Sequence, residues 1–186
     1  KPLYGVNHLA AHVTPEGLDE AKLARTVATA VRMLDNVIDV NFYTIPEARQ
    51  SNMRHRPVGL GLMGFQDALH TLRVPYASDA AVAFADTSME AIAFHAIAAS
   101  ADLAVERGRY TSFDGSLWSQ GVLPIDSLDR LAAARDPGDL DVDRSHRLDW
   151  DALRTRGRTA GMRNSNVLAI APTATISNIC GVSPSI

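Results

Sequence analysis

The sequence contains one cysteine, Cys180, among its 186 residues, so no disulfide can form within the chain. A lone thiol is typical of a reducing compartment, and we therefore expect a cytoplasmic protein. The chain lacks a run of about 18 apolar residues, so no membrane-spanning helix is predicted. Blocks of like charge are short, and 18 basic against 21 acidic residues give a net charge of -3. This balance argues against binding to nucleic acid or to a membrane surface.

The two ends lack the features of natural termini. Lys1-Pro2-Leu3-Tyr4 is neither an initiator methionine nor a signal peptide, and the chain stops at Ser183-Pro184-Ser185-Ile186 without a capping signal. We therefore expect an internal segment of a longer protein. What is present suits a folded core, because 46% of the residues are hydrophobic and 21% are charged.

Apolar residues at helical spacing predict a first long helix over about residues 18–40. It begins either at Thr14-Pro15 or at Asp19, and residues 41–46 end it with a proline. Its apolar stripe consists of Leu23, Val27, Ala30, Val31, Leu34 and Ile38.

A second long helix is predicted from Ser78, a favourable N-cap, to Arg107, with Gly108 placed to end it. The alanine-rich composition of this helix suits close packing against a neighbouring element. Its expected buried stripe consists of Val82, Ala85, Met89, Ile92, Ala96 and Leu103.

Shorter elements are expected in the rest of the chain. Residues 65–72 and 150–158 are predicted to be short helices, and residues 111–149 to be a turn-rich, loop-containing insertion. The apolar run 167–171 predicts a buried strand, and 58–63 is a shorter apolar run that includes two glycines. Long helices separated by short apolar strands indicate an α/β architecture.

The run Gly59-Leu60-Gly61-Leu62-Met63-Gly64 matches the G-x-G-x-x-G pattern of dinucleotide-binding turns. That pattern requires a hydrophobic strand before it and an acidic residue about 20 positions later, at the end of a second strand. Here residues 50–57 are polar, and Asp79 lies at a helix start. We interpret the run as a tight packing turn and keep a dinucleotide-binding module as an alternative.

Two patterns imitate metal sites. His8 and His12 are four residues apart, but no third ligand is close in sequence, so local structural roles are favoured. Asp139, Asp141 and Asp143 resemble the start of a calcium loop. Arg144 and Trp150 occupy the positions where that loop needs glycine and glutamate, so we expect a solvated acidic loop and no metal site.

Two further candidates concern catalysis. Asp35 and Asp39 share one helical face and could act as a carboxylate pair, but such pairs more often orient neighbouring segments. Cys180 has no histidine nearby in sequence that could activate it, so a buried, unreactive thiol is expected. We therefore predict no catalytic residue in this chain.

The run 167–171 leads into a turn formed by Pro172, Thr173, Ala174, Thr175, Ile176 and Ser177. Small and hydroxylated residues leave backbone N–H groups accessible, and Thr or Ser can cap a following helix. The first turn of a helix has unpaired donors and a partial positive charge, which suits phosphate oxygens. This turn is therefore a candidate anion site, although many strand-to-helix turns bind nothing.

Several blocks, in consistent order along nearly the whole chain, resemble the large, catalytic subunit of class I (aerobic) ribonucleotide reductase. The most specific is Ala169-Ile170-Ala171-Pro172-Thr173-Ala174-Thr175-Ile176-Ser177-Asn178. The other blocks are residues 32–39, 54–69, 84–90, 106–110, 115–118 and 161–166.

The resemblance implies that residues 1–186 form a single partial domain, from the second half of a ten-stranded α/β barrel. It implies reduction of ribonucleoside diphosphates through a cysteine thiyl radical, in the synthesis of DNA precursors. In that family, the turn from Pro172 to Ser177 holds the substrate's phosphates with backbone amides and hydroxyls.

Partners and cofactors follow from the same resemblance. The implied partners are the remainder of the large subunit, a metal-containing small subunit that supplies the radical, and thioredoxin or glutaredoxin as reductant. ATP and dNTP effectors regulate the parent, whereas this segment is expected to bind no cofactor of its own.

Departures from the family pattern limit what this segment can do alone. The family's radical cysteine lies in an Asn-x-Cys-x-Glu loop, and Cys180 follows Asn178 at that offset, but Val182 replaces the glutamate. The chain also has Lys1 where the family commonly has a redox cysteine. We therefore expect the segment alone to be inactive; an alternative is a silent part of a split subunit that acts only by assembly.

Overall fold

The structure is a computed structural model that describes residues 8–136, 138 and 142–186. Its first elements are a 3-10 helix, η1 (Leu9–His12), and an antiparallel hairpin of β1 (Val13–Thr14) and β2 (Gly17–Leu18). Helix α2 (Glu20–Val40) follows, and the Asp19 side chain caps it by accepting the Lys22 N–H. The predicted helix is confirmed with Asp19 as its start, because Thr14-Pro15 lies in the hairpin.

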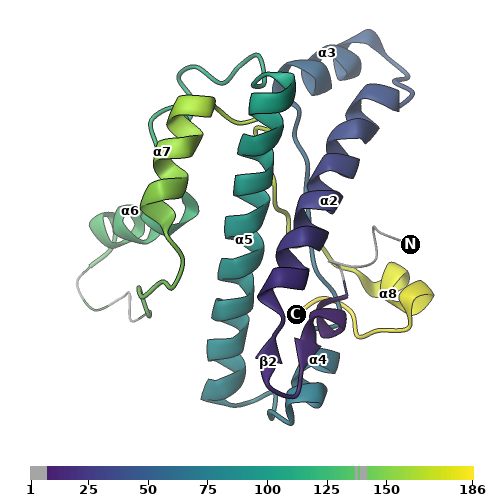
Figure 1. The fold of residues 1–186 in the computed structure, drawn as a ribbon, viewed down its shortest axis with the longest axis vertical. Coiled ribbons are helices and arrows are strands. Elements are labelled where there is room, and N and C mark those ends of the chain that lie inside the picture. The colour runs from purple at the N-terminus through teal and green to yellow at the C-terminus, as the bar shows by residue number, and fades with distance from the viewer. Residues whose placement is uncertain (1–7, 137, 139–141) are drawn as a thin grey trace.

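Helix α5 (Asp79–Arg107) is the central helix, with α2 on one side and α7 (Trp150–Ala160) on the other (Figure 1). Glu20 lies near His95 and Arg32 pairs with Glu106, so α2 and α5 run in the same direction. Neighbours on two sides bury much of α5. Its buried small residues are Ala81, Ser88, Ala91, Ala96, Ala99, Ser100, Ala101 and Ala104.

The predicted bounds of α5 are confirmed, since the Ser78 hydroxyl accepts the Ala81 N–H and Gly108 follows the last turn. In the predicted stripe, Ile92, Ala96 and Leu103 are buried, whereas Val82 is 69% exposed. That part of the prediction is wrong because the first turns of α5 extend past the starts of α2 and α7.

By length and composition, α5 also meets the criteria for a membrane-spanning helix, although it contains no unbroken run of about 18 apolar residues. However, 56% of its most apolar window is buried inside the fold. Burial of this kind is expected of the core helix of a globular domain.

Two extended segments run in parallel between and behind α2 and α5 (Figure 1). Val58 N–H donates to the Asn166 C=O at 3.0 Å, and Leu60 N–H donates to the Val167 C=O at 2.9 Å. The Leu60 C=O in turn accepts the Ala169 N–H at 3.1 Å. On the other edge of the first segment, His8 forms a parallel bridge with Met63.

The strand predicted over residues 167–171 is realised only as an isolated parallel bridge at Leu168. Val167 is buried, but Ile170 is 56% exposed, so the prediction of a buried strand fails beyond Leu168. The neighbouring segment, residues 58–63, ends at Met63 and is followed by α4. In the described part of the chain, residues 170–171 therefore have no paired strand.

The short helix predicted at 65–72 is confirmed as α4 (Phe65–Leu72), and the helix predicted at 150–158 is α7. The sequence did not predict α3 (Pro46–His55), η2 (Pro124–Asp126) or α6 (Ser127–Ala134), the last two of which lie in the turn-rich insertion. Neither α3 nor α6 has a buried residue, so both lie at the surface of the fold.

Candidate functional site

The candidate phosphate turn, residues 172–177, lies at the carboxyl ends of the two parallel segments. The segment 58–63 leads into α4 and the segment 166–171 leads into α8 (Ala174–Cys180), in the lower part of Figure 1. Thr173 is the N-cap residue of α8, and Gly181, in the left-handed conformation, ends it. Cys180 is half-buried rather than buried as predicted. The carboxyl ends of parallel strands are the usual location of ligand sites in α/β folds.

The residues of the turn divide into an exposed group and an inward-facing group. Pro172, Ala174 and Thr175 are exposed, and Ile176 is 41% exposed. Ser177 is fully buried, and its hydroxyl donates to the Ala174 C=O at 3.2 Å. Thr175 and the other residues of the first turn of α8 are therefore the exposed part of the turn.

Thr173 closes the turn against the segment that follows α8. Its Oγ1 accepts the Ser185 N–H at 2.7 Å, and its own N–H donates to the Ser185 Oγ at 3.3 Å. This reciprocal pair joins the two ends of the α8 loop. The Thr173 hydroxyl proton remains available for a further acceptor, since a hydroxyl can donate and accept at once.

The segment after α8 is held in turn by the start of α4. The Ser183 C=O accepts the Gly64 N–H at 2.8 Å, and the Ser183 N–H donates to the Asp67 Oδ2 at 2.7 Å. The hydrogen bond from the Ser183 N–H lowers the pKa of the Asp67 carboxyl below its ordinary value. Asp67 is therefore a carboxylate at neutral pH, in the first turn of α4, where the helix dipole favours negative charge.

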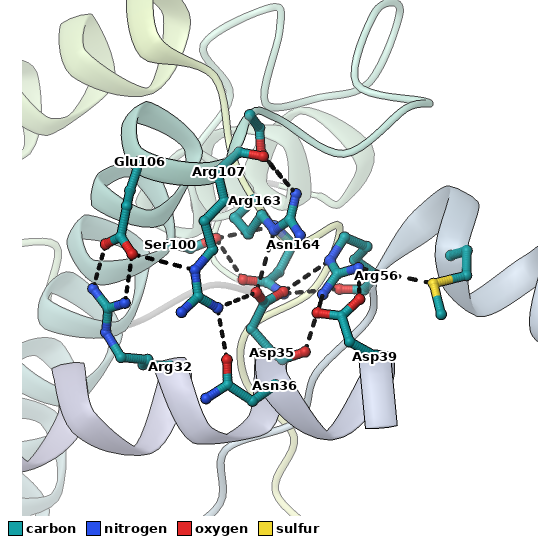
Figure 2. Close-up of polar contacts among 12 residues, drawn as sticks. Arg32, Asp35, Asn36, Asp39, Arg56, Ser100, Glu106, Arg107, Arg163 and Asn164 are labelled. Carbon is teal, nitrogen blue, oxygen red and sulfur yellow. Dashed lines mark hydrogen bonds and ion pairs between the residues drawn. The ribbon is translucent and has the colours of Figure 1, made fainter. Parts of the chain in front are cut away.

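A buried ion network lies at the opposite, amino ends of the same two segments, centred on Asp35 of α2 (Figure 2). The Asp35 Oδ1 accepts hydrogen bonds from the Arg56 Nε at 2.8 Å and from the Asn164 Nδ2 at 3.1 Å. The Oδ2 accepts from Arg107 and Arg163, each at 3.2 Å. A fully buried carboxylate thus has partners for both of its oxygens, as burial of a charge requires.

Asp39, one turn after Asp35, completes the partners of Arg56. It accepts two hydrogen bonds from that guanidinium, at 2.9 and 2.8 Å. Arg56 lies two residues before the first parallel segment, and Arg163 and Asn164 lie three and two residues before the second. The predicted role of Asp35 and Asp39, to orient neighbouring segments, is therefore confirmed.

The protonation of this network suits a structural clamp. Burial raises the pKa of Asp35, but the hydrogen bonds and charges of Arg56 and Arg163 outweigh burial, so the net change lowers its pKa. The hydrogen bond from Arg56 lowers the pKa of Asp39. At the exposed rim, Arg32 lowers the pKa of Glu106 to about 2. These carboxyls are ionised at neutral pH, so none is poised to donate a proton.

The glycine run packs against the chain itself. A Cβ at Gly59 would lie 2.9 Å from the Ala169 Cβ, and a Cβ at Gly61 would lie 2.8 Å from the Ala169 C=O. Both contacts are too short for a side chain, which confirms the interpretation as a close packing turn. Asp79 is the first residue of α5 and does not end a strand, so the dinucleotide alternative loses its structural basis.

The histidine candidates have structural surroundings. His12 is buried, its Nε2 lies 3.1 Å from the Thr26 Oγ1, and burial lowers its pKa.

Of the acidic residues that resemble a calcium loop, Asp139 and Asp141 lie outside the described residues, and Asp143 accepts hydrogen bonds from Ser145. Within the described ranges, no group of at least three His, Cys, Asp or Glu side chains could hold a metal ion.

Sequence reasoning missed a cavity of about 680 Å³ at the amino ends of the segments. Trp118 lines it and donates its indole N–H to the Ser165 C=O at 2.8 Å. His55, whose Nδ1 lies 2.6 Å from the Ser112 Oγ, forms another wall. The block 115–118 was noted for its resemblance, but nothing in its spacing indicates a cavity, because the walls come from distant parts of the chain.

Comparison with known proteins adds to this geometry. The family model of the ribonucleotide reductase barrel domain matches residues 5–186. The chain is 54% identical over 182 residues to the ribonucleoside-diphosphate reductase subunit alpha of Chlamydia muridarum, covering 98% of this chain and 17% of that protein.

More distant relatives carry corresponding names. The chain is 39% identical over 167 residues to the subunit alpha of Helicobacter pylori, covering 90% of this chain and 21% of the relative. It is 40% identical over 163 residues to the large chain of Neurospora crassa, covering 88% of this chain and 16% of the relative. The chain thus spans about a fifth or less of the length of these relatives.

Proposed function

Because the chain belongs to the ribonucleotide reductase family, whose barrel domain it matches over residues 5–186, we propose that it supplies the substrate-phosphate turn of a ribonucleoside-diphosphate reductase. The parent enzyme would reduce ribonucleoside diphosphates to deoxyribonucleoside diphosphates for DNA synthesis. The observation that carries this proposal is the 54% identity to a reductase subunit alpha across 98% of the chain.

The wider assembly is part of the same proposal. Residues 1–186 would form one segment of the second half of a ten-stranded barrel in a cytoplasmic large subunit. The partners would be the rest of that subunit, a radical-supplying small subunit with a metal centre, and thioredoxin or glutaredoxin; ATP and dNTP effectors would bind elsewhere. The lone Cys180 cannot both abstract hydrogen and supply a dithiol, so this segment would contribute binding rather than redox chemistry.

Within the turn, the exposed residues would make the phosphate contacts. They would do so through the Thr175 hydroxyl and the first-turn amides of α8, at the end of the fold where α4 also begins. Amide donors at a helix start favour anions. Thr173 and Ser177, which bond within the loop, would support the turn, with the Thr173 hydroxyl proton still free for a phosphate oxygen.

The test removes one amide donor in the intact large subunit. A proline at position 174 would be a poor choice, because the Thr173 ψ of 25° conflicts with the extended conformation required before proline. Replacement of Ala174 by lactic acid converts its amide into an ester and removes the N–H without that strain. Loss of a hydrogen bond to a charged oxygen costs about 1.5–3 kcal/mol, so diphosphate affinity should fall about tenfold or more.

The affinity of the bare nucleoside is the reference in each variant. Thr175→Ala should also lower the ratio of diphosphate to nucleoside affinity, since it removes a hydroxyl contact. Lactic acid in place of Ala80, in the first turn of α5, is the matched control and should leave the ratio unchanged. If neither change in the turn alters the ratio, residues 172–177 do not bind the phosphates.

A further inference from the structure

The backbone of Ser183 is held from both sides by the first turn of α4. Its carbonyl accepts the Gly64 N–H at 2.8 Å, and its N–H donates to the Asp67 carboxylate at 2.7 Å. Gly64 allows this approach, because its φ is +75° and a Cβ there would already lie 3.0 Å from the His8 ring. The start of α4 therefore binds the segment 182–185, which follows α8, through both backbone groups of Ser183.

Ser183 is connected to the start of α8 through a short series of contacts. Two residues after it, Ser185 exchanges two hydrogen bonds with Thr173, the N-cap of α8. At the other end of the helix, the Val182 N–H donates to the Ser177 C=O at 3.1 Å. The orientation of α8 thus depends on a returning segment that is anchored by the Asp67 side chain and by the Gly64 N–H.

The length of α8 makes this anchor necessary. The helix has seven residues, with Ser177 as its one buried member. A helix this short has little stability of its own, because helix nucleation is unfavourable. The direction of its first-turn amides must therefore come from tertiary contacts.

We infer that Asp67 is a positioning residue of the substrate-phosphate turn: its carboxylate fixes the segment 182–185, and through Ser185 and Thr173 it directs the amides of α8 toward the substrate. This inference rests on the proposed function. Asp67 lies on α4, is half-buried, and accepts the Ser183 N–H with its Oδ2. In this inference it acts through the loop and not by contacting the phosphates.

The experiment compares Asp67→Ala with Asp67→Asn in the intact large subunit, assayed with its small subunit and reductant. Alanine removes the acceptor of the Ser183 N–H, whereas asparagine keeps a carbonyl oxygen in its place. For Asp67→Ala, the ratio of diphosphate to nucleoside affinity should fall about tenfold, as expected when a hydrogen bond to a charged group is lost. Substrate KM should rise while kcat at saturation is retained, and Asp67→Asn should recover most of the ratio.

Asp86→Ala, at an exposed aspartate of α5, is the matched control and should behave as wild type. If Asp67→Ala does not fold, Ser185→Ala is the second variant: it removes the hydrogen bond from the Thr173 N–H to the Ser185 Oγ at the far end of the same series. It keeps the hydrogen bond from the Ser185 N–H to the Thr173 Oγ1, so it should lower the ratio by less than Asp67→Ala. A purely structural role would reduce the fraction of active enzyme, and thus kcat, without changing the affinity ratio.

The outcomes separate this inference from the proposed function. If the Ala174 ester and Thr175→Ala lower the ratio but Asp67→Ala or Ser185→Ala does not, Asp67 is not a positioning residue and the proposed function stands. If the ratio is insensitive to the Ala174 ester and to Thr175→Ala, both proposals are overturned.

Discussion

Among single residues, Asp35 places the strictest requirement on its surroundings, because a charged group with no exposed surface must be neutralised by its neighbours. Three arginines meet at this carboxylate, and Arg56 is itself 5% exposed. A buried pair of this kind adds little net stability compared with an apolar pair, but removing one partner is costly. We therefore expect the network to contribute mainly by favouring one arrangement of α2, α5 and the two parallel segments.

Asp35→Ala is expected to destabilise the barrel segment by about 3–5 kcal/mol, because Arg56 would stay buried with only Asp39 as a charged partner. Amide hydrogen exchange of the intact subunit should show lost protection in α2 and α5 and in residues 165–169. Asp86→Ala, at an exposed site on α5, serves as the control and should leave protection unchanged.

Acidity provides a second control for this prediction. The pKa of Asp35 is lowered on folding, so its contribution to stability is present above its ordinary value of 3.8 and is lost as the pH falls through the lower folded pKa. The difference in protection between wild type and Asp35→Ala should therefore shrink in acid. A difference that persists undiminished would assign the effect to packing rather than to charge.

The sequence could place Asp35 and Asp39 on one helical face, but it could not identify their partners. Arg56, Arg107 and Arg163 are 21, 72 and 128 residues from Asp35. Helical periodicity relates residues within a few turns, whereas contacts at these separations depend on how whole elements pack. For the same reason, the sequence could not predict the contact between Asp67 and Ser183, which are 116 positions apart.

At the scale of elements, the sequence predicted best where the determining interactions are local. The starts of α2 and α5 are set by the side chains of Asp19 and Ser78. Each of these side chains accepts a hydrogen bond from the backbone N–H of the residue three positions later. The extended segment 167–171 was less predictable, because burial of a strand depends on neighbours from elsewhere in the chain. Helix α3 was not predicted from the sequence because its residues are mostly polar and form no apolar stripe.

The close contact of the two parallel segments gives a test at this scale. Gly61→Ala should destabilise the fold by about 1–3 kcal/mol, the usual cost of overpacking, because the added Cβ would lie 2.8 Å from the Ala169 carbonyl oxygen. Thermal unfolding of the intact subunit would measure the change. The backbone cannot retreat easily, since Leu60 and Ala169 are hydrogen-bonded beside it.

Gly157→Ala is the matched control within α7. Its Cβ would meet the Met162 sulfur at 3.9 Å, an ordinary contact, so this change should be neutral or stabilise by about 0.5–1 kcal/mol. Equal melting temperatures for the two variants would contradict the close packing of the glycine run.

At the scale of the whole molecule, many of the exposed large apolar side chains of the described residues gather in two stretches. One lies at the end of α2 and before α3, where Val40 is 81% and Phe42 is 86% exposed. The other lies on and beside α8, where Ile170 is 56% and Ile179 is 73% exposed. Apolar groups clustered in this way are typical of surfaces that other parts of a protein cover. This distribution agrees with a chain that spans only 17% of a closely related subunit.

We therefore expect the isolated chain to associate in solution. Among the described residues, no strand pairs with the backbone of residues 170–171. Exposed strand edges together with apolar surface promote association between chains. Light scattering of the purified chain should show oligomers, and Phe42→Ser combined with Ile179→Ser should reduce their size by shortening both apolar stretches. Val105→Ser is the control, because Val105 is 71% exposed but lies outside both stretches. A compact monomer with a sharp, cooperative melt would mean that the chain is complete as a domain and would remove the support for a partial barrel.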